Sequence, residues 1–266
     1  MTNNYFCTKL NGAMNNIKIL PIFNQSAPNV WEDFIYIRGL SMDYIYDYHF
    51  NVEDYVLALD GFRDTWRHNS MNFAFGAYDG MNMVGFIRGY CNDRTAQIDN
   101  LYVLPKYMRH GIGGRLLAAA QRSVIFDADY AELVSLLHAK EFYARNNFTP
   151  VSRGSNRFYR TLSRSSLTGG NVVPVFYPNA TVARAVRAIA IKNNAEPVDI
   201  RKIRAQRTPM FVYLDAESKI RGFGVAGDTD KAPTRIQVDQ NYMTRYVSMC
   251  LGAKLSAVAH LHNNDR

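Results

Sequence analysis

The sequence has few cysteines and no long apolar segment. Its three cysteines, Cys7, Cys91 and Cys250, lie far apart, without the short spacings of a metal site or a disulfide framework. No apolar run approaches the roughly 18 residues that a membrane-spanning helix needs. The first residues, MTNNYFCTKLNGAMNN, have neither the basic flank nor the apolar core of a secretory signal. We therefore expect a cytoplasmic protein without a membrane partner.

The sequence does contain a globular composition with an uneven charge. Of its 266 residues, 47% are hydrophobic and 20% are charged, as in soluble folded proteins. Residues 1–80 have 5 basic and 9 acidic side chains (−4), residues 81–163 have 11 and 6 (+5), and residues 164–266 have 15 and 8 (+7). An acidic front and a basic back suggest two kinds of partner; solvated charged faces are the alternative.

A polar segment divides the chain. Residues 164–171 are rich in Ser and Gly and almost free of apolar side chains, which is typical of a linker. Before it we expect an N-terminal extension over residues 1–15 and a domain over residues 16–163. After it we expect a smaller C-terminal α/β domain over residues 172–266.

Both domains are expected to mix strands and helices. For the first, periodicity and turn residues predict strands at 17–23, 73–80, 83–91, 96–104 and 131–136, a hairpin of 148–153 with 156–162, and helices at 30–49, 52–67, from the glycine loop to about 125, and at 138–147. For the second, they predict strands at 172–176, 209–215, 219–227, 234–238 and 254–262, and helices at 181–194 and 241–253. The element orders are alike, and Gly85-Phe86 is echoed by Gly222-Phe223. An internal duplication and an unrelated small α+β domain both remain open.

The segment PKYMRHGIGGRLL, residues 105–117, places three glycines between a predicted strand and a helix. The first N–H groups of a helix have no partner inside it, and the helix dipole makes this end positive. Glycines let a phosphate approach such a backbone closely. There is no Gly-Lys-Ser/Thr, which excludes a P-loop, and no Gly two residues before Gly111, which excludes the dinucleotide fingerprint. The loop is a candidate phosphate site, and a tight turn is the alternative.

Two segments resemble motifs of the GNAT N-acetyltransferases. IDNLYVLPKYMRHGIGGRLL is similar to the family's coenzyme A-binding segment, Leu-x-Val-x-Pro followed by Gln/Arg-x-x-Gly-x-Gly/Ala, and AKEFYARNNF is similar to its Ala-x-x-x-Tyr-x-x-x-Gly-Phe motif. The matching residues are Leu101, Val103, Pro105, Gly111 and Gly113, then Ala139, Tyr143 and Phe148. The chain departs from the family at Met108, Leu136 and Asn147. Asn147 replaces a glycine, and Asn is the next best residue at a positive φ.

The resemblance covers residues 16–163 and implies the GNAT fold, an α+β fold with a mostly antiparallel central sheet flanked by helices. It also implies acetyl-CoA as co-substrate and no metal. The strand at 96–103 would pair with pantetheine, and the loop amides would hold the pyrophosphate. The implied acetyl-CoA-binding residues are Leu101, Tyr102, Val103, Arg109, His110, Gly111, Ile112, Gly113, Gly114 and Arg115.

The implied reaction is direct attack of an amine on acetyl-CoA. By its family position Tyr143 is the general acid that protonates the leaving thiolate, because a phenol with a pKa of about 10 is protonated at neutral pH; a packing aromatic is the alternative. Many relatives have an acidic residue on the fourth strand, where this chain has Gln97. Asp99, two residues on, lies on the same strand face. Asp99 is our candidate base, and a water chain without a protein base is the alternative.

The acceptor is not defined by a motif. The acidic and tyrosine side chains of SMDYIYDYHFNVEDYVLALDGFRD suit a cationic amine, so we expect an N-acetyltransferase acting on a primary amine of a small molecule or peptide. One alternative is a GNAT acting on RNA or aminoacyl-tRNA. Another is a non-catalytic coenzyme A sensor whose basic C-terminal domain binds nucleic acid, although no RNA-recognition motif supports this. A homodimer stays open.

The C-terminal domain itself is expected to transfer no acetyl group, because it has no glycine loop and no counterpart of Tyr143. Ending in a strand at 254–262, it would leave one apolar sheet face uncovered. The first domain or a second chain would then have to cover that face.

Overall fold

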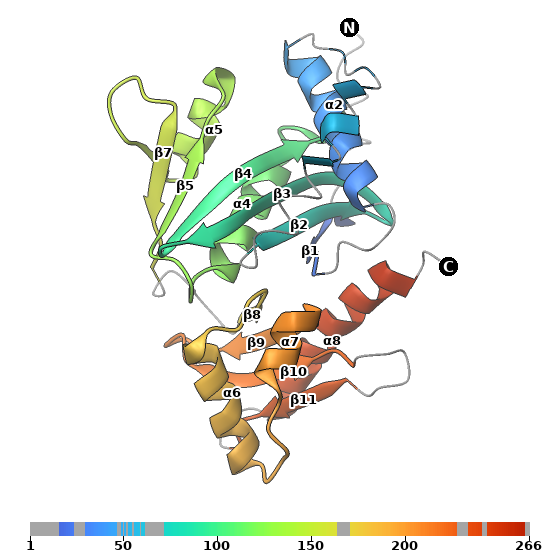
Figure 1. Ribbon diagram of the computed structural model, residues 1–266, viewed down its shortest axis with the longest axis vertical. Helices are drawn as coiled ribbons and strands as arrows, with labels where there is room; N and C mark the ends of the chain where they lie inside the picture. The colour runs from blue at the N-terminus through green and yellow to red at the C-terminus, as the bar shows by residue number, and fades with distance from the viewer. Residues whose placement is uncertain are drawn as a thin grey trace, which may run out of the picture.

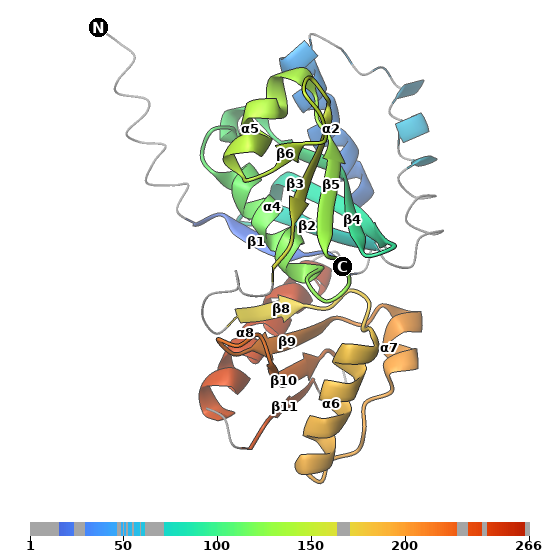
Figure 2. The same cartoon turned by 90° about the vertical axis from the view of Figure 1, so that its left-hand side faces the viewer.

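In the computed structural model, two sheets with their helices form two lobes, on either side of residues 164–170 (Figures 1 and 2). The structure describes residues 16–23, 30–46, 72–163, 171–227, 234–240 and 244–263, together with isolated residues between 49 and 61. Much of the helix predicted at 52–67 lies outside these residues.

The first lobe contains a seven-stranded sheet. Its strands are β1 (Lys18–Pro21), β2 (Asn72–Asp79), β3 (Asn82–Asn92), β4 (Thr95–Val103), β5 (Tyr130–Val134), β6 (Thr149–Pro150) and β7 (Arg157–Thr161). Their order is β1-β2-β3-β4-β5-β7-β6. Among the described strands of this sheet, only β4 and β5 pair in parallel. The predicted mixed fold with a mostly antiparallel sheet is confirmed.

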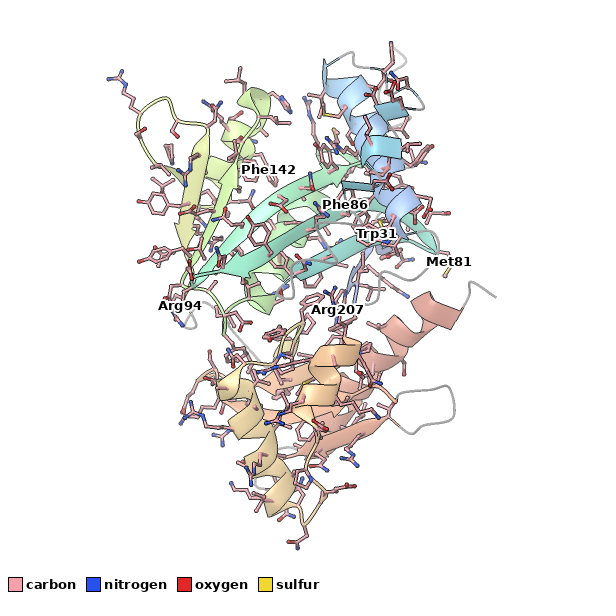
Figure 3. The ribbon with its side chains drawn as sticks, viewed as in Figure 1. Trp31, Met81, Phe86, Arg94, Phe142 and Arg207 are labelled. Carbon is pink, nitrogen blue, oxygen red and sulfur yellow. The ribbon has the colours of Figure 1, made fainter. Side chains whose placement is uncertain are left out.

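Helices cover both faces of this sheet. They are α2 (Val30–Tyr46), α4 (Ile112–Ser123) and α5 (Lys140–Arg145), with short 3-10 turns η2 (Pro105–Tyr107) and η3 (Leu137–Ala139). On one face α2 lies over β3 and β4, where Phe34 stacks on Phe86 with ring centroids 4.2 Å apart. Figure 3 labels Phe86 where β3 passes α2. On the other face α4 contacts β1 to β4 and buries Leu116 and Leu117 completely. α2 and α4 therefore bury the middle of the sheet between them.

The second lobe has a four-stranded antiparallel sheet. Its elements are β8 (Asn171–Pro174), α6 (Ala180–Lys192), α7 (Ile200–Gln206), β9 (Met210–Leu214), β10 (Ile220–Val225), β11 (Arg235–Val238) and α8 (Thr244–Asn263), with the strands in the order β11-β10-β9-β8. Alternate residues of β9 face opposite sides: Val212 packs with α6 and α7, whereas Tyr213 packs with α8. The sheet is therefore covered on both faces.

Two predictions for this lobe were wrong. Residues 254–262 form part of α8, not a strand, because Leu251, Leu255 and Val258 recur at helical spacing and are buried together. Since α8 covers the sheet, the expected uncovered face does not exist. The short helix α7 was not predicted; it begins at Ile200, is capped by the side chain of Asp199, and buries Ile203.

In the described part of the chain, no helix has the length and apolarity that crossing a bilayer requires.

Candidate active site

β4 and β5 pair over only part of their length. Residues 95–98 are aligned in parallel with residues 130–133. β4 then continues to Val103, and the two strands diverge (Figure 1). Beyond this point β5 no longer pairs with β4. The carbonyl of Val103 accepts a 3.1 Å hydrogen bond from Oγ of Ser41 in α2, and the other backbone N–H and C=O groups on the β5 side of β4 are not used by the sheet. Such unpaired strand groups can pair with an extended ligand.

A β-bulge in β4 lies where the strands diverge. Arg88 is aligned with Asn100, and the next pair along the ladder skips Asp99, so Asp99 is the additional residue. Gly89 permits this arrangement, because a β-carbon there would lie only 2.0 Å from the carbonyl oxygen of Gln97. The bulge places Asp99 and Asn100 on the same face of the sheet, the face of Arg88.

The side chains of Arg88, Asn100 and Asp99 meet at the bulge. Nε of Arg88 donates a 2.8 Å hydrogen bond to Oδ1 of Asn100, and Nη2 of Arg88 lies 3.9 Å from Oδ2 of Asp99. Burial lowers the pKa of Arg88 to about 10; Asp99 opposes this shift and Arg38 of α2 reinforces it. Partial burial raises the pKa of Asp99, and Arg88 opposes that rise. A carboxylate with a raised pKa beside the strand opening is suited to accept a proton.

A second carboxylate, Glu132 of β5, lies on the same face and was not among the predicted residues. Gln97 Nε2 donates to Glu132 Oε2 at 3.2 Å, and Arg157 Nη2 lies 3.4 Å from the same oxygen. Alternation in YAELV places Glu132 opposite the buried Leu133, which was the available sequence signal. Its two partners make Glu132 a less available proton acceptor than Asp99.

The loop before α4 enters the left-handed region twice, with φ 61° at Arg109 and 76° at Gly111. No side chain caps α4, and an early backbone bond of the helix joins the N–H of Arg115 to the carbonyl of Gly111 at 3.1 Å. The N–H groups of residues 112–114 therefore have no partner inside the helix. A β-carbon on Gly111 would meet nothing within 4 Å. This open, positive helix end is suited to an anion.

The next two glycines have a different neighbour. A β-carbon on Gly113 would lie 3.2 Å from Cζ of Phe142, and one on Gly114 would lie 3.3 Å from Oδ1 of Asn146. Both neighbours belong to α5 or its C-terminal cap. Gly113 and Gly114 thus let α4 and α5 pack closely, a purpose that the spacing of the glycines did not reveal.

Tyr143 lies on α5 among aromatic side chains. Its ring contacts those of Phe142, Phe148 and Phe158, and the residue is 8% exposed. Burial, with a smaller effect from Tyr102 of β4, raises the pKa of its phenol well above the usual value. Among the described residues its hydroxyl has no hydrogen-bond partner. The phenol is therefore held protonated with its donor free, on the β5 side of the strand opening.

Other predicted residues have partners in the fold. Tyr102 Oη lies 4.0 Å from Sδ of Met42, and His110 Nδ1 lies 2.6 Å from the carbonyl oxygen of Met108. Arg115 Nη2 donates at 2.6 Å to the carbonyl of Ile17. Ile112 is 2% exposed. Leu101 and Val103 are half-buried against the core, and Arg109 is exposed. Of the ten predicted acetyl-CoA-binding residues, several can therefore offer only backbone atoms.

Asn147 stands where the family motif has a glycine, and its backbone conformation is the predicted one. Its φ is 62°, so the residue occupies the left-handed conformation for which glycine is usual. The expectation that Asn serves there is confirmed.

The acidic region expected to bind the acceptor is only partly described. Asp43 of α2 pairs with His49, whereas Asp47, Tyr48 and Tyr55 lie outside the described residues. Within the described ranges, no three His, Cys, Asp or Glu side chains are grouped to hold a metal ion.

Comparison with known families gives a match over the part of the chain that contains this site. Residues 71–150 match the family model described as an acetyltransferase (GNAT) domain. This stretch of the chain is similar to a GNAT acetyltransferase domain. The match includes the bulge, the loop before α4 and Tyr143. It covers less than half of the chain, and the second lobe lies outside it.

Solved structures of acetyltransferases resemble about half of the chain. A GNAT-family acetyltransferase from Staphylococcus aureus Mu50 is 19% identical, with a TM-score of 0.46, over 55% of this chain and 99% of its own. The PaiA N-acetyltransferase from Thermoplasma acidophilum, solved in complex with coenzyme A, is 18% identical, with a TM-score of 0.44, over 54% of this chain and 99% of its own. Comparison with curated protein sequences gives no match.

Proposed function

We propose that this protein is an acetyl-CoA-dependent N-acetyltransferase that acetylates a primary amine of a small molecule or peptide. The observation that carries the proposal is the convergence of three features at one strand opening. These are the stretch of β4 beyond Ile98 that β5 does not pair, the uncapped N-terminus of α4 and the buried Tyr143. A coenzyme A thioester needs a strand-like partner for pantetheine, an anion site for its pyrophosphate and a proton donor for its sulfur.

The residues present fit acetyl-CoA. The N–H groups of residues 112–114 have no helical partner, and the space beside Gly111 is open, so a pyrophosphate could approach the backbone there. The exposed Arg109 adds a positive charge at the same loop. Residues 99–103 of β4 would pair with pantetheine. Bound there, acetyl-CoA supplies the activated acyl group.

Two side chains of the protein then transfer protons during the reaction. Asp99 accepts a proton from the acceptor ammonium, which frees the nitrogen lone pair to form the new C–N bond at the thioester carbonyl. The C–S bond breaks, and the hydroxyl of Tyr143 donates its proton to the departing sulfur. The attacking nitrogen must also lose a second proton to become a neutral amide, and this proton passes through solvent to the Tyr143 phenolate, which restores the phenol. The proton on Asp99 is released to solvent, so that one proton is released per acetyl group transferred. No oxidant or metal is required by this balance.

The open polar face around Asp99 and Glu132 favours an amine as the acceptor. Both carboxylates lie on this face and would attract a cation. Two other functions, a GNAT acting on RNA or aminoacyl-tRNA and a coenzyme A sensor, share the co-substrate site. We place the reaction in the cytoplasm, because Cys91 and Cys250 are free thiols.

A thiol-release assay tests the proposal. The full chain is incubated with acetyl-CoA and one acceptor at a time, and the free thiol released is measured. The acceptors are primary amines, peptides, aminoacylated tRNA and uncharged tRNA. We expect release that depends on an amine acceptor. Release only with aminoacyl-tRNA favours the RNA alternative. Tight coenzyme A binding without release for any acceptor supports a sensor and contradicts the enzyme.

A further inference from the structure

The second lobe repeats the first half of the GNAT domain, element by element. Strands β1-β2-β3-β4 and β8-β9-β10-β11 form antiparallel ladders in the same sequential order. After the first strand, α2 contacts β3 and β4, and α6 contacts β10 and β11. After the fourth strand, α4 contacts β1 to β4, and α8 contacts β8 to β11. Order and layers therefore correspond throughout.

The first strands of the two lobes also match in sequence. ILPIF at 19–23 corresponds to VVPVF at 172–176, and each proline ends an edge strand. The residue after each proline donates its N–H across the sheet at 2.9 Å, to the carbonyl of Ala74 in β2 in one lobe and of Met210 in β9 in the other. One register thus aligns both lobes.

The third strands share a close approach at glycine. Gly85 is aligned with Val103, and Gly222 with Val238. A β-carbon on Gly85 would lie 3.2 Å from Cγ2 of Val103, and one on Gly222 would lie 3.3 Å from Cγ2 of Val238. In each lobe the phenylalanine that follows the glycine is 0% exposed.

A bulge occurs at the same place in both lobes. The ladders between second and third strands skip Val84 in the first lobe and Arg221 in the second. The carbonyl of each skipped residue accepts an N–H from just after the fourth strand. The donors are Leu104 at 2.9 Å and Asp239 at 2.7 Å. An unrelated small domain would have no reason to reproduce both the bulge and its partner.

The lobes meet through equivalent residues. Phe23 and Phe176, which occupy the same position after β1 and β8, stack on each other with centroids 4.8 Å apart. Phe75 and Phe211 are also equivalent, since each is aligned with the proline. Phe23 meets Phe211 at 5.5 Å and 72°, and Phe176 meets Phe75 at 5.4 Å and 76°.

The helices repeat this exchange. α4 contacts β8 of the second lobe, and α8 contacts β1 of the first, where both views show the lobes meeting (Figures 1 and 2). Each contact from the first lobe to the second is thus matched by the equivalent contact in the opposite direction. This reciprocity is the property of an interface between two copies related by a two-fold axis.

The described part of the second lobe does not repeat the acetyl-CoA site. Among the described residues of the second lobe there is no equivalent of β5 or α5. The residues between β11 and α8, DQNYM, contain no glycine.

We propose that the second lobe is a half copy of the GNAT domain that covers, on the first lobe, the surface that a second copy of the first lobe would otherwise occupy. This inference goes beyond the proposed activity and does not depend on it. The first lobe would then have a self-complementary surface centred on Phe23 and Phe75. The partner of this surface, in the absence of the second lobe, would be the first lobe of another chain.

The test uses the full chain with a protease site inserted between residues 163 and 171. After cleavage of the folded protein, native mass spectrometry and light scattering give the stoichiometry, and circular dichroism reports folding. After cleavage of the protein without further substitutions, the two halves should stay together in a one-to-one complex. With Phe176→Asp the halves should separate and the first lobe should form a homodimer. Adding Phe23→Asp should convert that homodimer to a folded monomer.

Three results would overturn the proposal. One is a released, folded first lobe that is monomeric while Phe23 is intact. The second is a homodimer that persists with Phe23→Asp. The third is precipitation of the released lobe that Phe23→Asp does not prevent. If Phe176→Asp unfolds the second lobe, Phe23→Asp alone is used; it should separate the halves and leave a monomeric first lobe, and halves that stay together contradict the interface.

Discussion

Gly113 of α4 packs against the ring of Phe142 of α5, so that a β-carbon on this glycine would lie 3.2 Å from Cζ of Phe142. The contact joins the helix of the glycine loop to the helix of Tyr143. A bulky residue at position 113 would therefore displace α5 as well as a bound anion, and its effect on activity would not report on phosphate binding alone. Gly111, with open space beside it, is the better position for that question.

Gly111→Asp and Gly111→Asn form a matched pair. Both residues tolerate the positive φ of this position better than most side chains do, and they differ by one negative charge. We expect Asp to raise the Kd for acetyl-CoA at least about tenfold relative to Asn, because it repels the pyrophosphate. Calorimetry at low salt measures the difference. Equal affinities in two folded variants would place the pyrophosphate elsewhere.

Tyr143→Phe removes the free phenolic donor and preserves the aromatic packing with Phe148 and Phe158. We expect turnover to fall by about 10²–10⁴-fold while the Kd for acetyl-CoA changes little, since the hydroxyl acts only as sulfur leaves. Steady-state kinetics and calorimetry separate the two effects. Wild-type turnover would make Tyr143 a packing residue.

Asp99→Asn should abolish most of the amine-dependent turnover at neutral pH, because an amide cannot accept the proton. Glu132→Gln is the matched control on the same face, and it should retain most of the activity. Comparison of kcat/KM for the two variants decides between the carboxylates. The opposite ranking would identify Glu132 as the base, and two active variants would favour a water chain.

Arg88→Met should shift the pH profile. The guanidinium near Asp99 lowers the pKa of that carboxyl, so its removal raises the pKa, and kcat/KM should begin to fall at a higher pH as the solution is acidified. Arg88→Lys keeps the charge and should restore much of the wild-type profile. An unmoved acid limb with Arg88→Met would show that Asp99 is not the titrating base.

Asp127 predicts a pH dependence of stability. It lies after α4 and accepts a 3.0 Å hydrogen bond from Nδ2 of Asn179 in the second lobe. Burial raises its pKa to about 6, against the opposing effects of Asn179, Arg204 and Arg94. Because the folded-state pKa exceeds the unfolded value, the ionised group destabilises the fold above about pH 6, and this effect disappears as pH falls toward about 4.

Asp127→Asn should therefore stabilise the protein at pH 7.5, by on the order of 1–3 kcal/mol, and by roughly half as much at pH 5. Urea denaturation at the two pH values measures this. Asp129→Asn, which removes an exposed pair with Arg94, should change stability by less than about 1 kcal/mol. A destabilised Asp127→Asn protein at pH 7.5 would contradict the assignment.

The sequence predicted the first lobe well because its periodicity is strong. The strands around Gly80 and the helix after Gly111 were expected at nearly their observed bounds. The segment KLSAVAHLH was wrongly predicted as a strand, because its apolar residues alternate. Packing of Leu255 and Val258 against the second sheet favours a helix instead. Tertiary burial overrode a local pattern there.

The cluster at the bulge could not have been read from the sequence. Arg88 and Asn100 are brought together by the cross-strand register, and the extra residue at Asp99 is visible only once β3 and β4 are paired. Likewise, the echo of Gly85 at Gly222 became informative when both were found opposite a valine in the same ladder position.

A crystal structure of the full chain with coenzyme A tests the central claim most directly. We predict the pyrophosphate at the N–H groups of residues 112–114, pantetheine along β4 beyond Ile98, and the sulfur within about 3.5–4 Å of the Tyr143 hydroxyl. Coenzyme A bound away from the opening between β4 and β5, or a sulfur far from Tyr143, would contradict the account.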